Sequence, residues 1–213
     1  MIVKCAVSDM PNKLPQRFEP ASILYELPSI TDHIELGRLF PNVQSLEVEL
    51  GAGDGSFLVN YAQQYPERNF IGIERLLGRA RKLERKSRQA GLTNIRAIRI
   101  ESSYFIRYLI PPHSVSALHI YFPDPWPKRR HHRHRLINEQ FPAHACQALI
   151  LGGAVFLRTD DRAYFEQMTS VFNASNLFRP LDTPPELAAL LTDFERDFHA
   201  RGIPTLRAAF KAL

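Results

Sequence analysis

The stretch SLEVELGAGDGS, residues 45 to 56, decides the fold class of this chain. SLEVEL is typical of a short strand, and GAGDGS is a glycine turn. The following FLVNYAQQYP has helical spacing and stops at Pro66, because proline cannot continue a helix. A strand, a glycine turn and a helix in this order favour a parallel α/β sheet, in which ligands bind beyond the carboxyl ends of the strands.

The alternation of strand and helix continues downstream and occurs five times. It predicts an α/β fold with a parallel sheet and right-handed crossovers. Residues 1–44 are irregular and rich in proline, and we expect an N-terminal arm of uncertain structure with one short helix near 30–40, before a domain over 45–213. Strands are predicted at 45–50, 69–74, 94–100, 114–122, 154–159 and 205–210, and helices at 57–66, 75–91, 133–149, 162–175 and 184–202, with a short helix before Pro111.

Composition sets the class of protein. The 213 residues are 45% hydrophobic, enough for one well-buried core, and the formal net charge of +5 favours a polyanionic partner. Cys5 and Cys146 share no CxxC spacing, which disfavours a disulfide framework or a zinc knuckle. No apolar run approaches the roughly 18 residues of a membrane span. We expect a soluble protein of the reducing cytoplasm.

Two acids accompany the glycine turn. Glu49 precedes it, and Glu74 ends the next strand, where an acid that grips ribose hydroxyls is expected. The dinucleotide fingerprint GxGxxG would need a third glycine where Ser56 stands. An acid directly before the turn suits a cationic ligand better than a pyrophosphate. The pattern therefore favours S-adenosylmethionine over a dinucleotide, and a turn without any ligand is the remaining alternative.

The second informative stretch is FPDPWPKRRHHRHR, residues 122 to 135, just past the fourth strand of the domain. Its prolines restrict the backbone, so Asp124 is held at low entropic cost at the same edge as the glycine turn. Trp126 either stacks on a base or packs the loop. The three histidines are not spaced for a tetrahedral metal site, and no metal is expected. The basic run that follows Pro127 is suited to phosphate contacts or is simply a solvated face.

A second group of cations lies on the predicted helix over 75–91. The only acid among them is Glu84, and the cations span more than one helical face. This segment is either a solvated helix or an RNA contact. Its cations are Arg75, Arg79, Arg81, Lys82, Arg85, Lys86 and Arg88.

These motifs together resemble the single-chain bacterial tRNA (guanine-N7-)-methyltransferase family over residues 45–211. FPDPWPKRRHHRHR is similar to the family signature PDPWPKKRHxKRR, and TDFERDFHARGIP, residues 192 to 204, is similar to TxFExxFxxxGxPI. The resemblance implies a Rossmann-like class I methyltransferase fold with seven mostly parallel strands and helices on both faces. It further implies methyl transfer from S-adenosylmethionine to N7 of a guanine in the variable loop of tRNA, position 46 in tRNA convention.

The resemblance also implies roles for individual residues. The active-site acid is Asp124, which also contacts the methyl donor. Donor contacts are expected from Glu49, Glu74 and Glu101, and substrate contacts from Lys128, Asp160, Thr192, Phe194 and Glu195. Independently of the resemblance, the glycine turn predicts donor contacts from Gly51, Gly53 and Gly55, and the charge of the basic run predicts tRNA phosphate contacts from Arg129, Arg130, Arg133 and Arg135. The sequence departs from the family pattern at Glu101, where Asp or Asn is usual, at Asp193, which is Lys in some members, and at His134, where Arg is common.

Other functions remain open at this point. An NAD-linked oxidoreductase would share the sheet, a non-enzymatic RNA-binding module would keep the fold without the chemistry, and a related methyltransferase would act on another RNA or base. Whether the protein is a monomer or a homodimer is also open.

Overall fold

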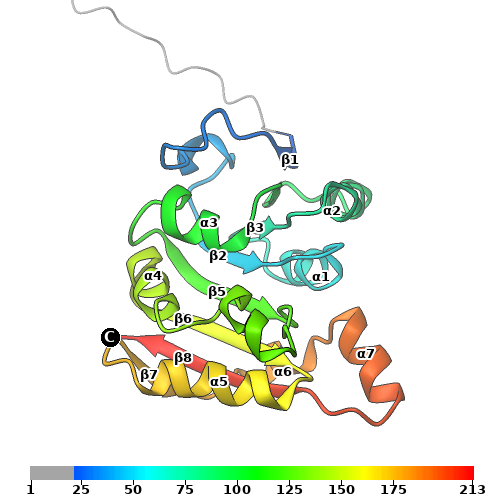
Figure 1. The fold of residues 1–213 in the computed structure, drawn as a ribbon. Helices are drawn as coiled ribbons and strands as arrows, with labels where there is room; N and C mark the ends of the chain where they lie inside the picture. The colour runs from blue at the N-terminus through cyan, green and yellow to red at the C-terminus, as the bar shows by residue number, and fades with distance from the viewer. Residues whose placement is uncertain (1–21) are drawn as a thin grey trace, which may run out of the picture.

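The computed structural model describes residues 22–213 of the chain, apart from the side chain of Arg129. Its centre is an eight-stranded sheet with the order β1-β4-β3-β2-β5-β6-β8-β7 (Figure 1). The strands from β1 to β6 run parallel, and β8 is antiparallel to both of its neighbours. The strands are β1 Leu24–Tyr25, β2 Ser45–Leu50, β3 Arg68–Ile73, β4 Ile95–Ile98, β5 Val115–Tyr121, β6 Leu149–Thr159, β7 Phe178–Leu181 and β8 Leu206–Ala212.

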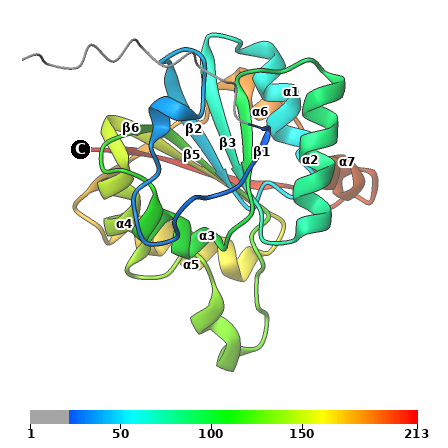
Figure 2. The same cartoon turned by 90° about the horizontal axis from the view of Figure 1, so that it is seen from above.

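Helices cover both faces of the sheet, as Figure 2 shows: α1 and α2 lie on one face, and α3, α4 and α5 lie on the other. Side chains along β2 point alternately to the two faces of the sheet, so this strand packs against the helices on both faces. Val48 and Leu50 belong to the core cluster that contains Phe141 and Phe172, whereas Glu47 and Glu49 point to the opposite side. The helices are η1 Leu36–Arg38, α1 Ser56–Gln64, α2 Leu77–Gln89, α3 Ser102–Tyr104, η2 Phe105–Leu109, η3 Arg129–His134, α4 Phe141–Ala148, α5 Arg162–Asn173, α6 Pro185–Ala189 and α7 Asp193–Ala200.

The predicted α/β class and the mostly parallel sheet are confirmed, with eight strands in place of seven. The predicted strands and the helices α1, α2 and α5 are present with small changes at their ends, except for β6. This strand begins at Leu149, five residues before the predicted start at 154, and includes Gly152 and Gly153. The short strands β1 and β7 were not predicted.

Three predicted helices are wrong in their extent. The helix expected over 133–149 is divided into η3 and α4, because Pro142 is tolerated only in the first turn of a helix and α4 therefore begins at Phe141. The helix expected over 184–202 is divided into α6 and α7, because Thr192 caps a new helix. The helix expected near 30–40 is only the three-residue η1.

Residues 22–44, the described part of the predicted arm, pack against the main domain. The Ile34 amide donates to the Leu109 carbonyl at 2.8 Å, and the Tyr104 hydroxyl donates to the Ile30 carbonyl at 2.8 Å. Leu39 is fully buried in the core. The first 21 residues, including Cys5, lie outside the described part.

Candidate functional site

The glycine turn lies at the carboxyl end of β2 and is fixed to the next strand. The amides of Gly51 and Ala52 both donate to the Ile73 carbonyl, at 2.9 and 2.8 Å. Gly55 has a φ of +79° and precedes the first turn of α1, and a Cβ at this position would lie 2.6 Å from Leu83 Cγ. Glycine is therefore required at 55 both by the backbone conformation and by the close approach of α2.

Glu74 shapes the turn from the end of β3. Its side chain is buried, and Oε2 accepts a hydrogen bond from the Gly53 amide at 3.0 Å while Oε1 accepts one from the Leu76 amide at 2.7 Å. Sequence reasoning predicted a ribose contact and did not foresee this structural role. The two roles are compatible, since each carboxylate oxygen has a second lone pair.

Glu49 is the most unusual acid of this edge. It is 4% exposed, and its Oε2 atom has no hydrogen-bond partner within residues 22–213. Burial raises the pKa of Glu49 to about 8, against the attraction of Arg158, and the nearby Asp54 and Glu74 raise it further. A buried acceptor without a partner is costly unless a ligand satisfies it. A cationic ligand beside Glu49 would supply this partner and would stabilise the ionised carboxylate.

Glu101 is the N-cap of the short helix α3. Its carboxylate accepts hydrogen bonds from the amides of Ser103 and Tyr104, at 3.0 and 2.7 Å, and the residue is exposed. This capping interaction explains an acid at this position by itself. The predicted contact with the adenosine end of the donor stays a prediction.

The loop after β5 holds Asp124 in an uncommon backbone conformation. Phe122 and Trp126, on either side of the Pro-Asp-Pro turn, have φ values of +50° and +45°. Residues other than glycine rarely adopt such values, and backbone strain of this kind clusters at functional sites. Asp124 itself is exposed, and its carboxylate has no hydrogen bond within the described part of the chain. It is therefore free to bind a ligand.

Trp126 packs the loop. Its ring lies 5.1 Å from the ring of His134 and 5.8 Å from that of His131, so two histidines of the basic run cover it. Of the two alternatives that the sequence left open for Trp126, the contacts favour packing.

Arg135 corrects one prediction. It was expected to contact a tRNA phosphate, yet it is 4% exposed, and its Nε atom donates to the Pro125 carbonyl at 2.7 Å. Its guanidinium also bonds Gln167 and lies 4.7 Å from the centre of the Tyr164 ring. This buried side chain holds the loop that carries Asp124 through its bond to the Pro125 carbonyl. It is not placed to contact a polyanion.

The rest of the basic run is at the surface. Lys128, Arg130 and Arg133 are exposed and form no ion pair with a described acid, which suits the predicted phosphate contacts. In Figure 2 this run forms the short helix that projects from the carboxyl edge of the sheet. The side chain of Arg129 lies outside the described part.

The tail contributes one exposed and two buried residues of the predicted substrate site. Thr192 and Glu195 form a capping box at the start of α7, in which the Glu195 amide donates to Thr192 Oγ1 at 3.0 Å and the Thr192 amide donates to Glu195 Oε2 at 2.9 Å. Phe194 is 54% exposed, and its ring lies 6.1 Å from that of Phe122. Asp160, directly after β6, is also exposed.

Glu195 is fully buried within an ion-pair network that the sequence did not reveal. Its Oε2 atom is 2.7 Å from Arg158 Nη1, and its Oε1 atom is 2.8 Å from Arg207 Nη2. Burial raises the pKa of Glu195, but the Thr192 amide and the two guanidinium groups outweigh it and hold that pKa below its usual value. Direct contact with a substrate, as predicted for Glu195, does not fit this burial.

Arg158 is the residue that sequence reasoning missed. It is 1% exposed, donates to the carbonyls of Leu187 and Leu190 as well as to Glu195, and lies 4.2 Å from the Tyr121 ring centre. The available signal was an arginine within the otherwise apolar AVFLRT. It joins β6 to the segment that carries α6 and α7.

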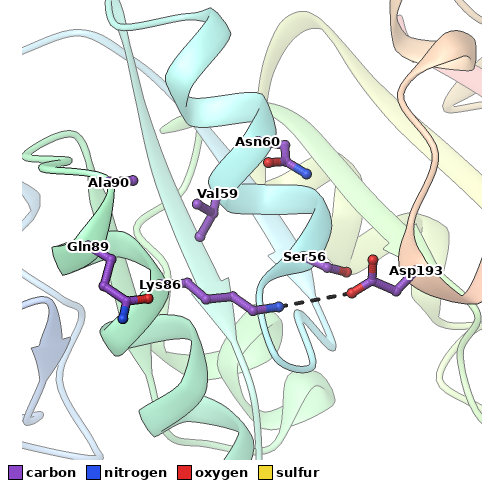
Figure 3. Close-up of a pocket in the computed structure, with 7 residues that line it drawn as sticks. All are labelled: Ser56, Val59, Asn60, Lys86, Gln89, Ala90 and Asp193. Carbon is purple, nitrogen blue, oxygen red and sulfur yellow. Dashed lines mark ion pairs between the residues drawn. The ribbon is translucent and has the colours of Figure 1, made fainter.

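A hollow of about 380 Å³ lies beside the glycine turn, between α1, α2 and the start of α7 (Figure 3). The Lys86 side chain extends across this hollow, and its Nζ atom lies 2.8 Å from Asp54 Oδ2 and 4.0 Å from Asp193 Oδ2. None of the residues predicted to bind the donor lines this hollow. The predicted donor residues lie instead along the carboxyl edge of β2, β3, β4 and β5.

Within the described residues, no group of three or more His, Cys, Asp or Glu side chains is arranged to hold a metal ion. No helix in residues 22–213 is both long and apolar enough to span a bilayer.

Comparison with known proteins adds a family to this geometry. A family described as "Putative methyltransferase" matches residues 43–208. A Vibrio cholerae protein named tRNA (guanine-N(7)-)-methyltransferase is 35% identical over 171 residues, which are 78% of this chain and 72% of that protein. A Deinococcus radiodurans protein of the same name is 35% identical over 179 residues, 79% of this chain and 56% of that protein.

Solved structures support the fold alone, since their sequence identity is low. The 16S rRNA methyltransferase KamB aligns with a TM-score of 0.56 at 17% identity, over 79% of this chain and 88% of that chain. TrmN from Thermus thermophilus aligns with a TM-score of 0.59 at 15% identity, over 79% of this chain and 44% of that chain.

Proposed function

The chain belongs to the tRNA (guanine-N(7)-)-methyltransferase family, and on this premise we propose that it transfers a methyl group from S-adenosylmethionine to N7 of a guanine in tRNA. The observation that carries the proposal is the presence of two acids at one sheet edge. One is the buried Glu49 beside the glycine turn, whose Oε2 atom has no hydrogen-bond partner in residues 22–213, and the other is the exposed Asp124 on the strained loop after β5. A tRNA substrate also supports a cytoplasmic location for the enzyme.

The residues at the glycine turn fit the donor. S-adenosylmethionine supplies an electrophilic methyl group on a positively charged sulfur and also carries an ammonium group. Burial keeps Glu49 protonated near neutral pH in the free protein, because its pKa is raised to about 8. When the cationic donor binds, Glu49 would release this proton to solvent, and its Oε2 atom, which lacks a partner within residues 22–213, would accept from the ammonium group. Glu74 would accept from ribose hydroxyls with its remaining lone pairs. The glycines allow the backbone to approach the donor closely, because no Cβ intervenes.

The acceptor needs little activation. Guanine N7 carries a lone pair in the neutral base, so no proton has to be removed before it attacks. The chain's own contribution is then to align the base with the donor, which lowers the barrier by positioning. Asp124 would accept hydrogen bonds from the N1–H and N2–H₂ edge of the guanine. Its negative charge would also stabilise the positive charge that develops on the purine.

The tail acts in two ways in this proposal. Phe194, which is exposed beside Phe122, would contact the substrate directly, and exposed Asp160 is a second candidate for a polar contact. Thr192 and Glu195 would act through the fold, because the capping box and the pairs with Arg158 and Arg207 fix where α7 begins. They are positioning residues for Phe194.

Methylation of a tRNA transcript with isotope-labelled donor, followed by nuclease digestion and mass mapping, tests the proposal. We expect one methyl group on one variable-loop guanine. Asp124→Ala should lower kcat/KM by on the order of 100-fold or more while the unfolding midpoint stays unchanged. Asp182→Ala, which removes an exposed carboxylate beyond β7, is the matched control.

The possible failures are distinct. Label on another base would indicate a methyltransferase of different specificity. Binding of tRNA without any label would indicate an RNA-binding module without the chemistry. Unchanged turnover by Asp124→Ala would remove that residue from the site.

A further inference from the structure

From the charge and exposure of α2 we infer that this helix is a second tRNA-binding surface, which holds the phosphate backbone on the side of the donor site opposite to η3. The inference rests on the proposed function and deepens it, because it assigns a place to a part of the substrate that the active-site loop does not reach.

The outward face of α2 is a stripe of cations. Ala80, Leu83 and Ser87 are its buried residues, and their spacing places them on one side of the helix. At about 100° per residue, Arg81, Lys82 and Arg85 lie on the opposite side, and all three are exposed. The helix therefore uses one face for the core and presents positive charge on the other.

Few acids neutralise this stripe. The only acid in α2 is Glu84, whose Oε1 atom is 2.9 Å from Arg88, and Lys86 is engaged with Asp54 at 2.8 Å. Arg81, Lys82 and Arg85 form no ion pair with any acid in residues 22–213. Like charges this close repel one another, and a polyanion would relieve the repulsion.

The position of α2 relates the stripe to the active site. The helix begins at Leu77, three residues after Glu74, so its first turn lies at the carboxyl edge of the sheet. In the sheet order, β3 and β2 separate α2, which packs on β4, from β5 and the basic η3 that follows it. Figure 2 shows α2 at the side of the molecule and the projecting basic helix at the sheet edge. A polyanion that contacts both would pass over the glycine turn and Asp124.

Nucleic acid fits this surface better than a membrane does. A helix that lies in a bilayer needs a free apolar face, and the apolar face of α2 is already buried against the sheet. A phosphate backbone needs only exposed cations with a regular spacing, which the stripe supplies.

The salt dependence of tRNA binding tests the inference. The test variant carries Arg81→Gln, Lys82→Gln and Arg85→Gln. The control variant carries Arg38→Gln, Arg179→Gln and Lys211→Gln; two of its positions lie on β7 and β8 at the far edge of the sheet. Both variants lose three positive charges, from +5 to +2, so general attraction changes equally. The probe is an unmodified tRNA transcript, and binding is followed between about 0.05 and about 0.3 M salt.

Each lost phosphate contact should lower the slope of log K against log salt by about 0.7–0.9. We expect the test variant to lose about 2 to 3 from the slope, to bind on the order of 100-fold more weakly near 0.1 M salt, and to keep its affinity for S-adenosylmethionine. The control should keep the wild-type slope. The inference would be overturned if the two variants changed the salt slope equally or if neither changed it. It would also be overturned if the test variant kept its affinity for tRNA and lost binding to anionic phosphatidylserine vesicles. Because binding is measured without turnover, a failure of methyl transfer would be seen separately.

Discussion

Replacing Glu49 by glutamine should make the protein more stable at alkaline pH, although it removes a predicted donor contact. Glu49 is buried at 4% exposure, and burial raises its pKa from 4.5 to about 8 in the folded protein. Below about pH 4.5, Glu49 is protonated in both states and the stability does not depend on it. Between the two pKa values the unfolded chain releases the proton while the folded protein keeps it, so the free energy of unfolding falls as the pH rises.

The size of this effect follows from the difference of about 3.5 between the two pKa values. At about 1.4 kcal/mol per pH unit, the full difference corresponds to roughly 5 kcal/mol. Most of it, up to about 4 kcal/mol, falls between about pH 5 and about pH 9. A glutamine side chain cannot ionise, so over this range the Glu49→Gln variant should gain that amount relative to the wild type.

The measurement is urea unfolding of wild type and Glu49→Gln at about pH 5, about pH 7 and about pH 9. Comparing the two proteins at each pH cancels the titration of the groups that do not interact with Glu49. Glu47→Gln is the internal control on the same face of β2, because His119 and Arg68 outweigh burial and hold the pKa of Glu47 below its usual value. This variant should lose stability near neutral pH instead. A constant difference between wild type and Glu49→Gln across the three pH values would mean that Glu49 is ionised throughout.

Further outcomes are expected at the tail, the glycine turn and the loop. Arg158→Met should lower the free energy of unfolding by about 3–5 kcal/mol in urea titrations, since it leaves Glu195 with less compensation for its burial, and a smaller loss would show that Arg207 suffices. Thr192→Ala should cost about 1 kcal/mol in the same assay through loss of the N-cap, and an unchanged stability would contradict the capping box. Gly55→Ala should destabilise by more than about 1 kcal/mol, because φ is +79° and the added Cβ meets Leu83; calorimetry should also register weaker donor binding. Arg135→Gln should lower the free energy of unfolding and leave the salt slope of tRNA binding unchanged. Lys128→Gln should lower the salt slope and leave the stability unchanged, because Lys128 is exposed. A lower salt slope for Arg135→Gln, with an unchanged slope for Lys128→Gln, would instead support Arg135 as a phosphate contact.

Much of the sheet could be predicted because its strands are short apolar runs between clear breaks. The stretch from Ser45 to Pro66 predicts a strand, a glycine turn and a helix, and the structure agrees with each. β7 escaped prediction because FRPL contains a proline and three of its four residues are exposed, as suits an edge strand. β1 is only two residues long, and its pairing with β4 is set by the tertiary fold.

The site was predictable in its residue types and less so in its contacts. Charge and spacing identified Glu49, Glu74 and Asp124 as members of one edge, since parallel strands end together. Burial cannot be read from a cation within a basic run, so Arg135 was grouped with exposed arginines that it does not resemble. In the same way, Glu195 is paired with Arg158 and Arg207 across three elements, and no local pattern announces such a network.

The position of β8 has a consequence for synthesis of the molecule. This strand, formed by residues 206–212, is inserted between β6 and β7, which precede it in the chain. Until β8 leaves the ribosome, β6 has an unpaired edge and β7 has no strand to pair with in residues 22–205. Either strand could then pair with a neighbouring nascent chain. A product truncated near residue 205 would lose Arg207 as well, and Glu195 would lose one of its two cations. Such fragments should precipitate, and only polypeptides that include β8 should be recovered from the supernatant.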